Sequence, residues 1–223
     1  MSLRRLLTYA VPPLFLTALL FSVVLAPEDA FLRASQRIFY IHVAVAWTGM
    51  VAYFVSFVYA VRYLIRRTLR DDQLSAASAE VGTVLITAVL VSGSIWARVA
   101  WNTWWTWDPR LVTTAVLWFL YVGYLLVRSL IPRPEARALV ASVLNIIAFL
   151  DVPVVYLSVH WWATIHPVII TDRGIALGSP LMVWAMILSA AAMLAFYVPI
   201  LECLYLLRRN REELEALKAE IRG

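Results

Sequence analysis

The stretch that decides the fold runs from Glu80 to Arg110 and reads EVGTVLITAVLVSGSIWARVAWNTWWTWDPR. Its first part, residues 80–100, is mostly apolar, and a transmembrane helix needs roughly 20 such residues to cross the hydrocarbon layer of a bilayer. The second part is crowded with tryptophan, with five rings between Trp96 and Trp107. Such rings either anchor a chain at the membrane interface or form a surface for a large flat ligand.

The rest of the chain has the same apolar character. Its 223 residues are 63% hydrophobic and only 15% charged, and the mean hydropathy is +0.80, well above the usage of soluble globular proteins. We therefore expect an all-α fold, a single polytopic membrane domain over residues 1–223 with short loops between six transmembrane helices. The expected spans are residues 6–26, 38–61, 80–100, 111–128, 139–159 and 181–206. The first is interpreted as a retained helix because it is longer than the apolar core of a signal peptide.

The basic residues predict the orientation of these spans. With six spans both termini share a side, and that side carries 14 of the 19 Lys and Arg residues. Basic residues are enriched on the cytoplasmic side of membrane proteins, so both termini are expected in the cytoplasm. The pI of about 9.6 then reflects topology and a membrane lipid environment, and nothing in the sequence suggests a nucleic acid partner.

The opposite, outer side receives three loops, at about residues 27–37, 101–110 and 160–180. All three histidines of the chain lie in or just beneath these loops: His42, His160 and His166. Most tryptophans fall on or near the same side: Trp96, Trp101, Trp104, Trp105, Trp107, Trp161, Trp162 and Trp184. Interfacial tryptophans normally occur at both faces of a membrane protein, so anchoring alone explains this asymmetry poorly.

This combination of side chains suits one kind of ligand. Neutral imidazole binds iron and zinc, indole offers flat apolar surface, and a nearby arginine such as Arg110 can bind a carboxylate in a bidentate manner. A flat, apolar, iron-bearing dicarboxylate is haem. The sequence contains no Cys-x-x-Cys-His for covalent attachment, and its one cysteine is Cys203.

Asp108 has a structural interpretation that competes with a ligand contact. In Asp108-Pro109 an N-cap residue precedes a proline at the first helical position, which is a common start of a helix. Ser179-Pro180 repeats the signal before the sixth span. We therefore expect Asp108 to cap the fourth helix, bonding the backbone N–H of Arg110 or Leu111.

Three blocks of sequence resemble a known family. The block WNTWWTWDPR resembles the tryptophan-rich signature of the WWD family, the haem-handling proteins of cytochrome c maturation. RIFYIHVAVAW at the second span and VPVVYLSVHWWATIHP at the end of the fifth are also similar to that family. The six-span layout resembles its smallest branch, the CcmC proteins, since larger members carry additional spans.

The resemblance implies a function and a set of partners. It implies non-covalent haem b on the periplasmic side of a bacterial inner membrane, which is then passed to the haem chaperone CcmE. The implied partners are the transporter subunits CcmA and CcmB and the small membrane subunit CcmD, and the implied role is haem binding and transfer rather than catalysis. His42 and His166 match the axial histidines. The other residues expected at the haem are Trp101, Trp104, Trp105, Trp107, Asp108, Arg110, Trp161 and Trp162.

Two departures from the family leave alternatives open. Asn102 stands where the family usually has glycine after the first tryptophan, which puts the local turn in doubt. His160 is an extra histidine beside the expected ligand, so it is the alternative to His166 at the iron.

Other functions remain to be compared with haem delivery. The main alternative is a b-type cytochrome anchor of a redox complex, which would place paired histidines deep within helices. A zinc site formed by the three histidines lacks a His-Glu-x-x-His motif or a nearby carboxylate base. Transport of haem through the bilayer would need intramembrane ionisable groups. Asp151 is the clear example, and Pro153 two residues later is expected to break the helix hydrogen bonding there.

The C-terminal tail, residues 207–223, is expected to form an amphipathic cytoplasmic helix. Leu214, Leu217 and Ile221 would lie on one stripe of that helix. The stripe either docks on a partner protein or belongs to a solvated helix end.

Overall fold

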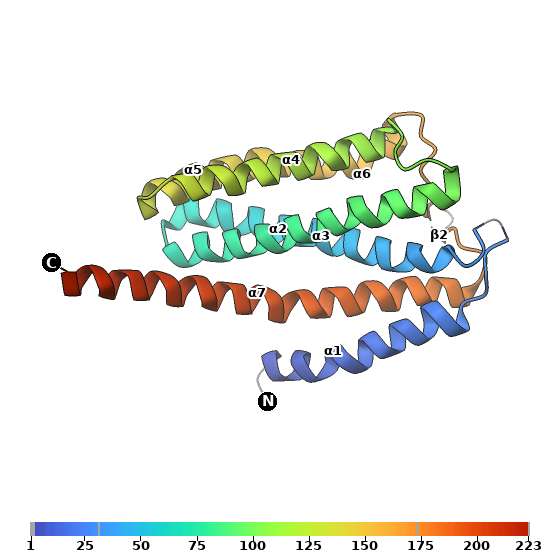
Figure 1. Ribbon diagram of the computed structural model, residues 1–223, viewed down its shortest axis with the longest axis horizontal. Helices are drawn as coiled ribbons and strands as arrows, with labels where there is room; N and C mark the ends of the chain where they lie inside the picture. The colour runs from blue at the N-terminus through green and yellow to red at the C-terminus, as the bar shows by residue number, and fades with distance from the viewer. Residues whose placement is uncertain (1–2, 31, 173, 223) are drawn as a thin grey trace.

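The computed structural model describes residues 3–30, 32–172 and 174–222, and this part of the chain is almost entirely helical (Figure 1). Helices alternate with connections, most of which are short. The elements are α1 (Leu3–Leu19), the π-helix η1 (Leu20–Leu25), α2 (Gln36–Arg66), α3 (Leu69–Trp101), α4 (Pro109–Leu130), α5 (Pro134–Phe149), α6 (Asp151–Trp161), the strands β1 (Ile170–Thr171) and β2 (Gly174–Ile175), and α7 (Pro180–Arg222).

The expected helical membrane bundle is confirmed. Within the described residues, five segments are long and apolar enough to cross a membrane: Gln36–Arg66, Leu69–Trp101, Pro109–Leu130, Pro134–Trp161 and Pro180–Glu215. A shorter apolar helical segment, Tyr9–Leu25, occupies the place of the first expected span. Both termini lie toward one end of the bundle (Figure 1), which we call the terminal end. The opposite end, formed by residues 26–30, 32–35, 102–108, 162–172 and 174–179, is called the histidine end.

Within the described residues, the two strands are the only regular secondary structure that is not helical. They pair antiparallel, with Ile170 opposite Ile175 and Thr171 opposite Gly174. This small hairpin lies in the long connection between α6 and α7, which the sequence analysis predicted only as a loop.

Helix α3 begins well before the apolar run that predicted it. Its N-cap is Thr68, whose hydroxyl accepts from the backbone N–H of Asp71 (3.4 Å). The added turns carry Asp71 and Asp72, which are buried because they meet arginines from other helices. Arg62 of α2 lies 3.2 Å from Asp71. Arg128 of α4 makes two hydrogen bonds of 2.6 Å to Asp72. Hydropathy finds the part of a helix inside the membrane, whereas caps and ion pairs determine where this helix starts.

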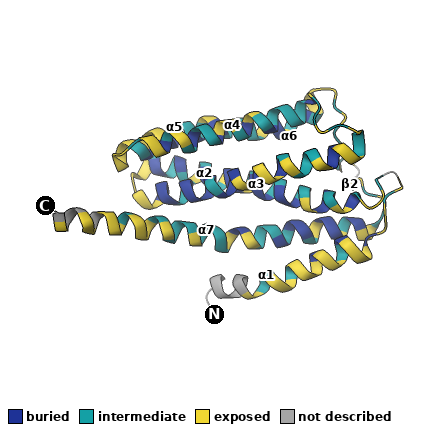
Figure 2. Ribbon diagram, in the orientation of Figure 1, coloured by how far each residue is buried: buried dark blue, intermediate teal, exposed yellow. Residues whose placement is uncertain are grey.

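The tail is helical, and it continues α7 without a break as far as Arg222. One face of this extension is held to the bundle through Glu212, which accepts from Arg137 of α5 (2.9 Å) and from Gln73 of α3 (2.5 Å). The apolar residues of the tail, Leu214, Leu217 and Ile221, are exposed. The extension projects beyond the other helices at the terminal end (Figure 2).

The fifth expected span consists of two helices. α5 ends at Phe149 and α6 begins at Asp151, with Leu150 between them in a turn. Pro153 accounts for the break, because a proline cannot donate to the carbonyl four residues earlier, here that of Phe149, and its ring clashes with it. Asp151 therefore lies at a helix interruption, as its proximity to Pro153 predicted.

Helices α2 and α3 form the centre of the bundle, and small residues let them pack closely. A Cβ on Gly82 would lie 2.6 Å from the ring of Tyr53, and a Cβ on Gly49 would lie 2.9 Å from Cδ1 of Ile86. The Tyr53 ring is itself stacked on Tyr121 of α4, with centroids 3.5 Å apart. Membrane helices associate through such small residues because lipid provides no hydrophobic driving force. The buried residues concentrate in these central helices, whereas α1 and the end of α7 are largely exposed (Figure 2).

Candidate functional site

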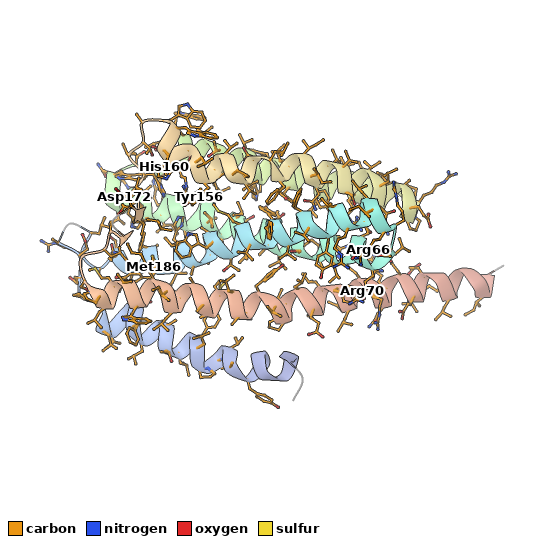
Figure 3. All side chains as sticks on the ribbon, turned by 180° about the vertical axis from the view of Figure 1, so that it is seen from behind. Arg66, Arg70, Tyr156, His160, Asp172 and Met186 are labelled. Atoms are coloured by element: carbon orange, nitrogen blue, oxygen red, sulfur yellow. The ribbon has the colours of Figure 1, made fainter. Side chains whose placement is uncertain are left out.

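The histidine end brings together residues that are distant in sequence. His42 lies near the start of α2, and His166 lies in the connection that follows α6. His160 is in the last turn of α6. Figure 3 shows His160, Tyr156 and Asp172 at this end, with Arg66 and Arg70 far away toward the terminal end.

A largely apolar cavity lies between α2, α3 and α4 at the histidine end. Its empty space totals about 820 Å³, part of it open to solvent. His42 and His166 both line this cavity, and His160 does not. Its aromatic wall consists of Trp47, Trp96, Trp101 and Trp105, and Arg110 adds a charge.

A second cavity adjoins the first, and several residues line both cavities. It has about 740 Å³ of empty space, and His42, Trp47, Trp96, Arg110 and His166 border both cavities. Tyr156 and His160 line only the second cavity. The His160 side chain is exposed, with its ring centroid 6.4 Å from that of Tyr156. All three histidines thus reach the second cavity, whereas only the expected ligand pair reaches the first.

Asp108 caps α4, as predicted, and it also holds the loop that carries His166. Its Oδ1 accepts from the backbone N–H of Arg110 (3.0 Å). Its Oδ2 accepts from the Thr164 hydroxyl (2.7 Å) and from the backbone N–H of Ile165 (2.9 Å). The Thr164 hydroxyl in turn accepts from the backbone N–H of His166 (2.9 Å). The carboxylate is buried, and both of its oxygens are bound by protein groups.

Asn102 ends α3 in the conformation that glycine usually supplies. Its φ and ψ are 56° and 23°, in the left-handed region. Asparagine is one of the few residues other than glycine that adopts this region readily. The carbonyl of Asn102 accepts from Nη1 of Arg98 (2.7 Å). The departure from the family's usual glycine therefore preserves a left-handed turn at this helix end.

The tryptophans fall into two groups. Trp101 and Trp105 line the first cavity, and the Trp101 ring lies 6.3 Å from that of His166. The other four predicted tryptophans are exposed at the histidine end and border neither cavity: Trp104 (59% exposed), Trp107 (84%), Trp161 (57%) and Trp162 (49%).

Two tryptophans that line the cavities were absent from the predicted site. Trp96 packs edge-on against Trp101, with centroids 5.1 Å apart, and it borders both cavities. Its position at the edge of the tryptophan cluster was a usable signal. Trp47 reaches the cavities only because α2 packs against α3, and nothing local in the sequence indicates that contact.

His166 is neutral near pH 7. Burial, the Arg110 guanidinium and His42 together lower the pKa of its imidazole to about 4, against a smaller opposing effect of Asp108. Neutral imidazole is the form that binds a metal. Its Nδ1 is buried and has no hydrogen-bond partner among the described residues.

The cavity fits haem by the chemistry of its lining. Besides His166 Nδ1, the indole Nε1 of Trp96 is buried without a partner in the described part of the chain. A bound ligand would satisfy both atoms, with iron at an imidazole nitrogen and an acceptor at the indole N–H. Arg110 donates one hydrogen bond to the carbonyl of Tyr156 (3.3 Å), and its guanidinium has further donors for a carboxylate. The described residues contain no group of three His, Cys, Asp or Glu side chains placed to hold a metal ion.

A comparison with known families matches almost the whole chain. The model of the family described as CcmC, heme exporter protein C, matches residues 2–220. The chain belongs to the CcmC family. Its resemblance to that family in the tryptophan and histidine blocks is thereby confirmed.

Several curated relatives are similar to this CcmC-family chain. Heme exporter protein C of Bradyrhizobium diazoefficiens is 29% identical over 204 residues, which cover 90% of this chain and 78% of the relative. Heme exporter protein C of Escherichia coli is 36% identical over 141 residues, or 63% of this chain and 58% of the relative. A putative cytochrome c biosynthesis ccmC-like mitochondrial protein of Marchantia polymorpha is 32% identical over 154 residues, or 68% of this chain and 65% of the relative. The match spans less than two thirds of the last two relatives.

Proposed function

We propose that this chain binds haem at its histidine end and delivers it to the haem chaperone CcmE during the maturation of c-type cytochromes. One observation carries the proposal: His42 and His166 come from distant parts of the chain and line one cavity with four tryptophans. The names of its relatives, heme exporter protein C and cytochrome c biosynthesis protein, point to the same cargo and pathway.

The cavity suits haem b held without a covalent bond. Its two imidazoles would serve as axial ligands, its indoles would contact the flat macrocycle, and Arg110 would bind a carboxylate. Cys203, the one cysteine, lies on α7 and borders neither cavity. A chain that holds and releases haem in this way acts as a carrier rather than as a catalyst.

The charge distribution supports an orientation in the bacterial inner membrane. The terminal end carries most of the basic residues, so it faces the cytoplasm and the histidine end faces the periplasm. CcmA, CcmB and CcmD would be the further partners. The exposed stripe of Leu214, Leu217 and Ile221 is the surface we expect an ATP-driven CcmA–CcmB pair to reach from the cytoplasm.

The geometry does not favour the b-type cytochrome anchor. An electron-transfer haem is normally buried between helix-borne histidines, whereas His166 lies in a loop at the end of the bundle. A carrier is expected to release its haem to an acceptor, and an electron-transfer subunit is expected to retain it through cycles of reduction and oxidation.

The proposal is tested by haem transfer between purified proteins. The chain is loaded with haem in detergent, mixed with CcmE and separated again, and the haem on each protein is measured by absorbance. We expect haem to move to CcmE and not to a matched soluble protein such as albumin at the same concentration. Retention of all haem on this chain, with reversible redox cycling, would support the anchor function instead.

The two groups of tryptophan provide a matched pair of variants for this assay. Trp101→Ala with Trp105→Ala should weaken haem binding, because both rings line the cavity. Trp104→Ala with Trp107→Ala should leave binding close to wild type and slow the transfer, because these rings are exposed where an acceptor would arrive. Equal loss of binding in both double variants would contradict this division.

A further inference from the structure

The two expected ligands, His42 and His166, differ in the groups that hold their imidazole rings. Nδ1 of His42 lies 3.0 Å from the Ser92 hydroxyl of α3. That hydroxyl donates its proton to the carbonyl of Ala88 (2.7 Å). A hydroxyl has one proton, so Ser92 must accept from His42 rather than donate to it. Nδ1 is therefore the protonated nitrogen, and Nε2 is left with a free lone pair.

The neighbouring residue of α3 also restrains the His42 ring. A Cβ on Gly93 would lie 3.1 Å from Cε1 of His42, so the α3 backbone lies directly against the imidazole. His42 is itself carried by the long helix α2. Its ring is thus fixed by a helix, by a hydrogen bond at Nδ1 and by contact with the backbone of a second helix.

His166 has no comparable support at its ring. Its backbone is held through Thr164, and Asp108 holds Thr164 and Ile165. Its Nδ1 makes no hydrogen bond within the described chain, and the ring contact that the structure records is edge-on, with Trp101 at 6.3 Å. The loop is tethered, whereas the imidazole is held by packing alone.

We propose that His166 is the ligand that leaves iron first when haem is handed on and His42 is the ligand that leaves last, with Ser92 as the positioning residue of His42. This inference rests on the proposed function. Histidines that bind metals usually donate their second ring N–H to an anchoring group, and loss of that group costs roughly 10–100-fold in affinity. Ser92 gives this support to His42, so the bond to His166 is the weaker of the two.

In a handover both iron–imidazole bonds would break, the His166 bond first. Its electron pair would return to the ring nitrogen and a donor atom of the acceptor would supply the replacement pair, and the His42 bond would be exchanged afterwards. No electron is gained or lost. The bond from His42 Nε2 holds the haem in the cavity until the acceptor has bound.

The first test uses the protein without haem. With ¹⁵N-labelled histidine, and with His160→Gln and His166→Gln to assign the signals, NMR distinguishes the two imidazole tautomers. We expect His42 to be protonated at Nδ1 in the wild type and in Ser92→Thr, and to lose that preference in Ser92→Ala. Ser129→Ala is the matched control, because Ser129 also donates to a helix carbonyl, that of Leu126 (2.7 Å), and lies outside the site. A wild-type His42 protonated at Nε2 would overturn the role of Ser92.

The second test identifies the ligand that leaves first. Cyanide is mixed with the haem-loaded protein, and the rate at which it replaces the first axial histidine is followed by absorbance. We expect Thr164→Val, which loosens the His166 loop, to raise this rate, and Ser92→Ala to leave it unchanged while lowering haem affinity roughly 10–100-fold. A faster exchange in Ser92→Ala with no change in Thr164→Val would show that His42 leaves first. If the wild type binds no haem, the proposed function fails, although the tautomer experiment still reports on Ser92 and His42.

Discussion

At the scale of single residues, Asp108 joins two parts of the site that are separate in sequence. One carboxylate oxygen caps α4 and the other holds Thr164 and Ile165 of the His166 loop. Capping alone would let asparagine replace Asp108 without loss, because Asn caps about as well as Asp. The bonds from Asp108 to Thr164 and Ile165, which we call the Asp108 clamp, mean that asparagine should not replace Asp108 without loss.

We therefore predict that Asp108→Asn folds but places His166 poorly. The new amide can still cap α4 through its oxygen, whereas its NH₂ group faces the N–H of Ile165 as donor against donor, which costs about 1–3 kcal/mol for a buried group. Haem affinity should fall with little change in helix content by circular dichroism. Ser179→Ala, which removes the similar cap of α7 (3.3 Å to Met182 N), is the control and should keep haem affinity. Wild-type affinity in Asp108→Asn would show that the clamp is dispensable.

Asn102 gives a second prediction at this scale. Asn102→Gly should be tolerated, because glycine adopts a φ of 56° at no steric cost. Asn102→Val should destabilise the protein by roughly 1–2 kcal/mol, since a β-branched side chain is strained in the left-handed region that Asn adopts readily. Thermal unfolding in detergent measures both variants. A valine variant as stable as the glycine variant would mean that the turn readily changes its conformation.

These two residues show what a sequence can and cannot predict locally. Asp108-Pro109 predicted a helix cap because capping involves residues within one turn. The bonds from Asp108 to Thr164 and Ile165 join residues from two different loops, and only the packing of α4 beside α6 brings them together. Asn102 departs from the family's usual glycine, and its left-handed backbone conformation cannot be deduced from residue identity alone.

At the scale of helices, the packing of α2 on α3 depends on Gly49 and Gly82. The side chain that faces Gly82 is more rigid than the one that faces Gly49. Gly82→Ala should cost more stability than Gly49→Ala. The ring that a Cβ on Gly82 would meet belongs to Tyr53, which is stacked on Tyr121, whereas the nearest atom to a Cβ on Gly49 is the flexible end of Ile86. The free energy of unfolding in detergent is the measurement.

Gly123 of α4 provides the matched control, because nothing lies within 4 Å of its Cβ position. Gly123→Ala should stabilise the protein by up to about 1 kcal/mol through helix propensity. Destabilisation of the same size by all three alanine variants would argue against a packing cause.

Hydropathy predicts where the membrane spans lie, but it does not predict the residues at which the helices begin and end. Residues 80–100 predicted the intramembrane part of α3, but the helix starts at Leu69, because Asp71 and Asp72 are neutralised by Arg62 and Arg128 from other helices. In the same way, Pro153 indicated an interruption near Asp151, while the separation into α5 and α6 is a property of the folded chain.

At the scale of the whole molecule, the buried pair of Asp72 and Arg128 ties α3 to α4 at the terminal end. Both side chains are almost fully buried, with 2% and 6% of their area exposed. Removal of one partner leaves an uncompensated charge, which costs roughly 3–5 kcal/mol, whereas replacement of both by apolar residues is often neutral. Asp72→Leu should therefore lower the unfolding temperature in detergent, and Asp72→Leu with Arg128→Met should recover most of the loss. A double variant less stable than the single one would mean that the pair itself is strongly stabilising.

The site is also a property of the whole molecule. The tryptophans and histidines were predicted to gather at one end because spans of known direction put their loops there. Which tryptophans border the cavity could not be predicted, since Trp104 and Trp105 are neighbours in sequence and only the second faces it. Trp47 and Ser92 reach the site from the middle of helices, through the contact of α2 with α3.

The most direct test of the account is the absorption spectrum of the purified protein titrated with haem. We predict a six-coordinate low-spin spectrum for the wild type and for His160→Ala. His42→Ala and His166→Ala should each lose it, because only these two histidines line the first cavity. The account would be contradicted if His160→Ala lost a ligand while His166→Ala kept the wild-type spectrum, or if His42→Ala bound haem unchanged.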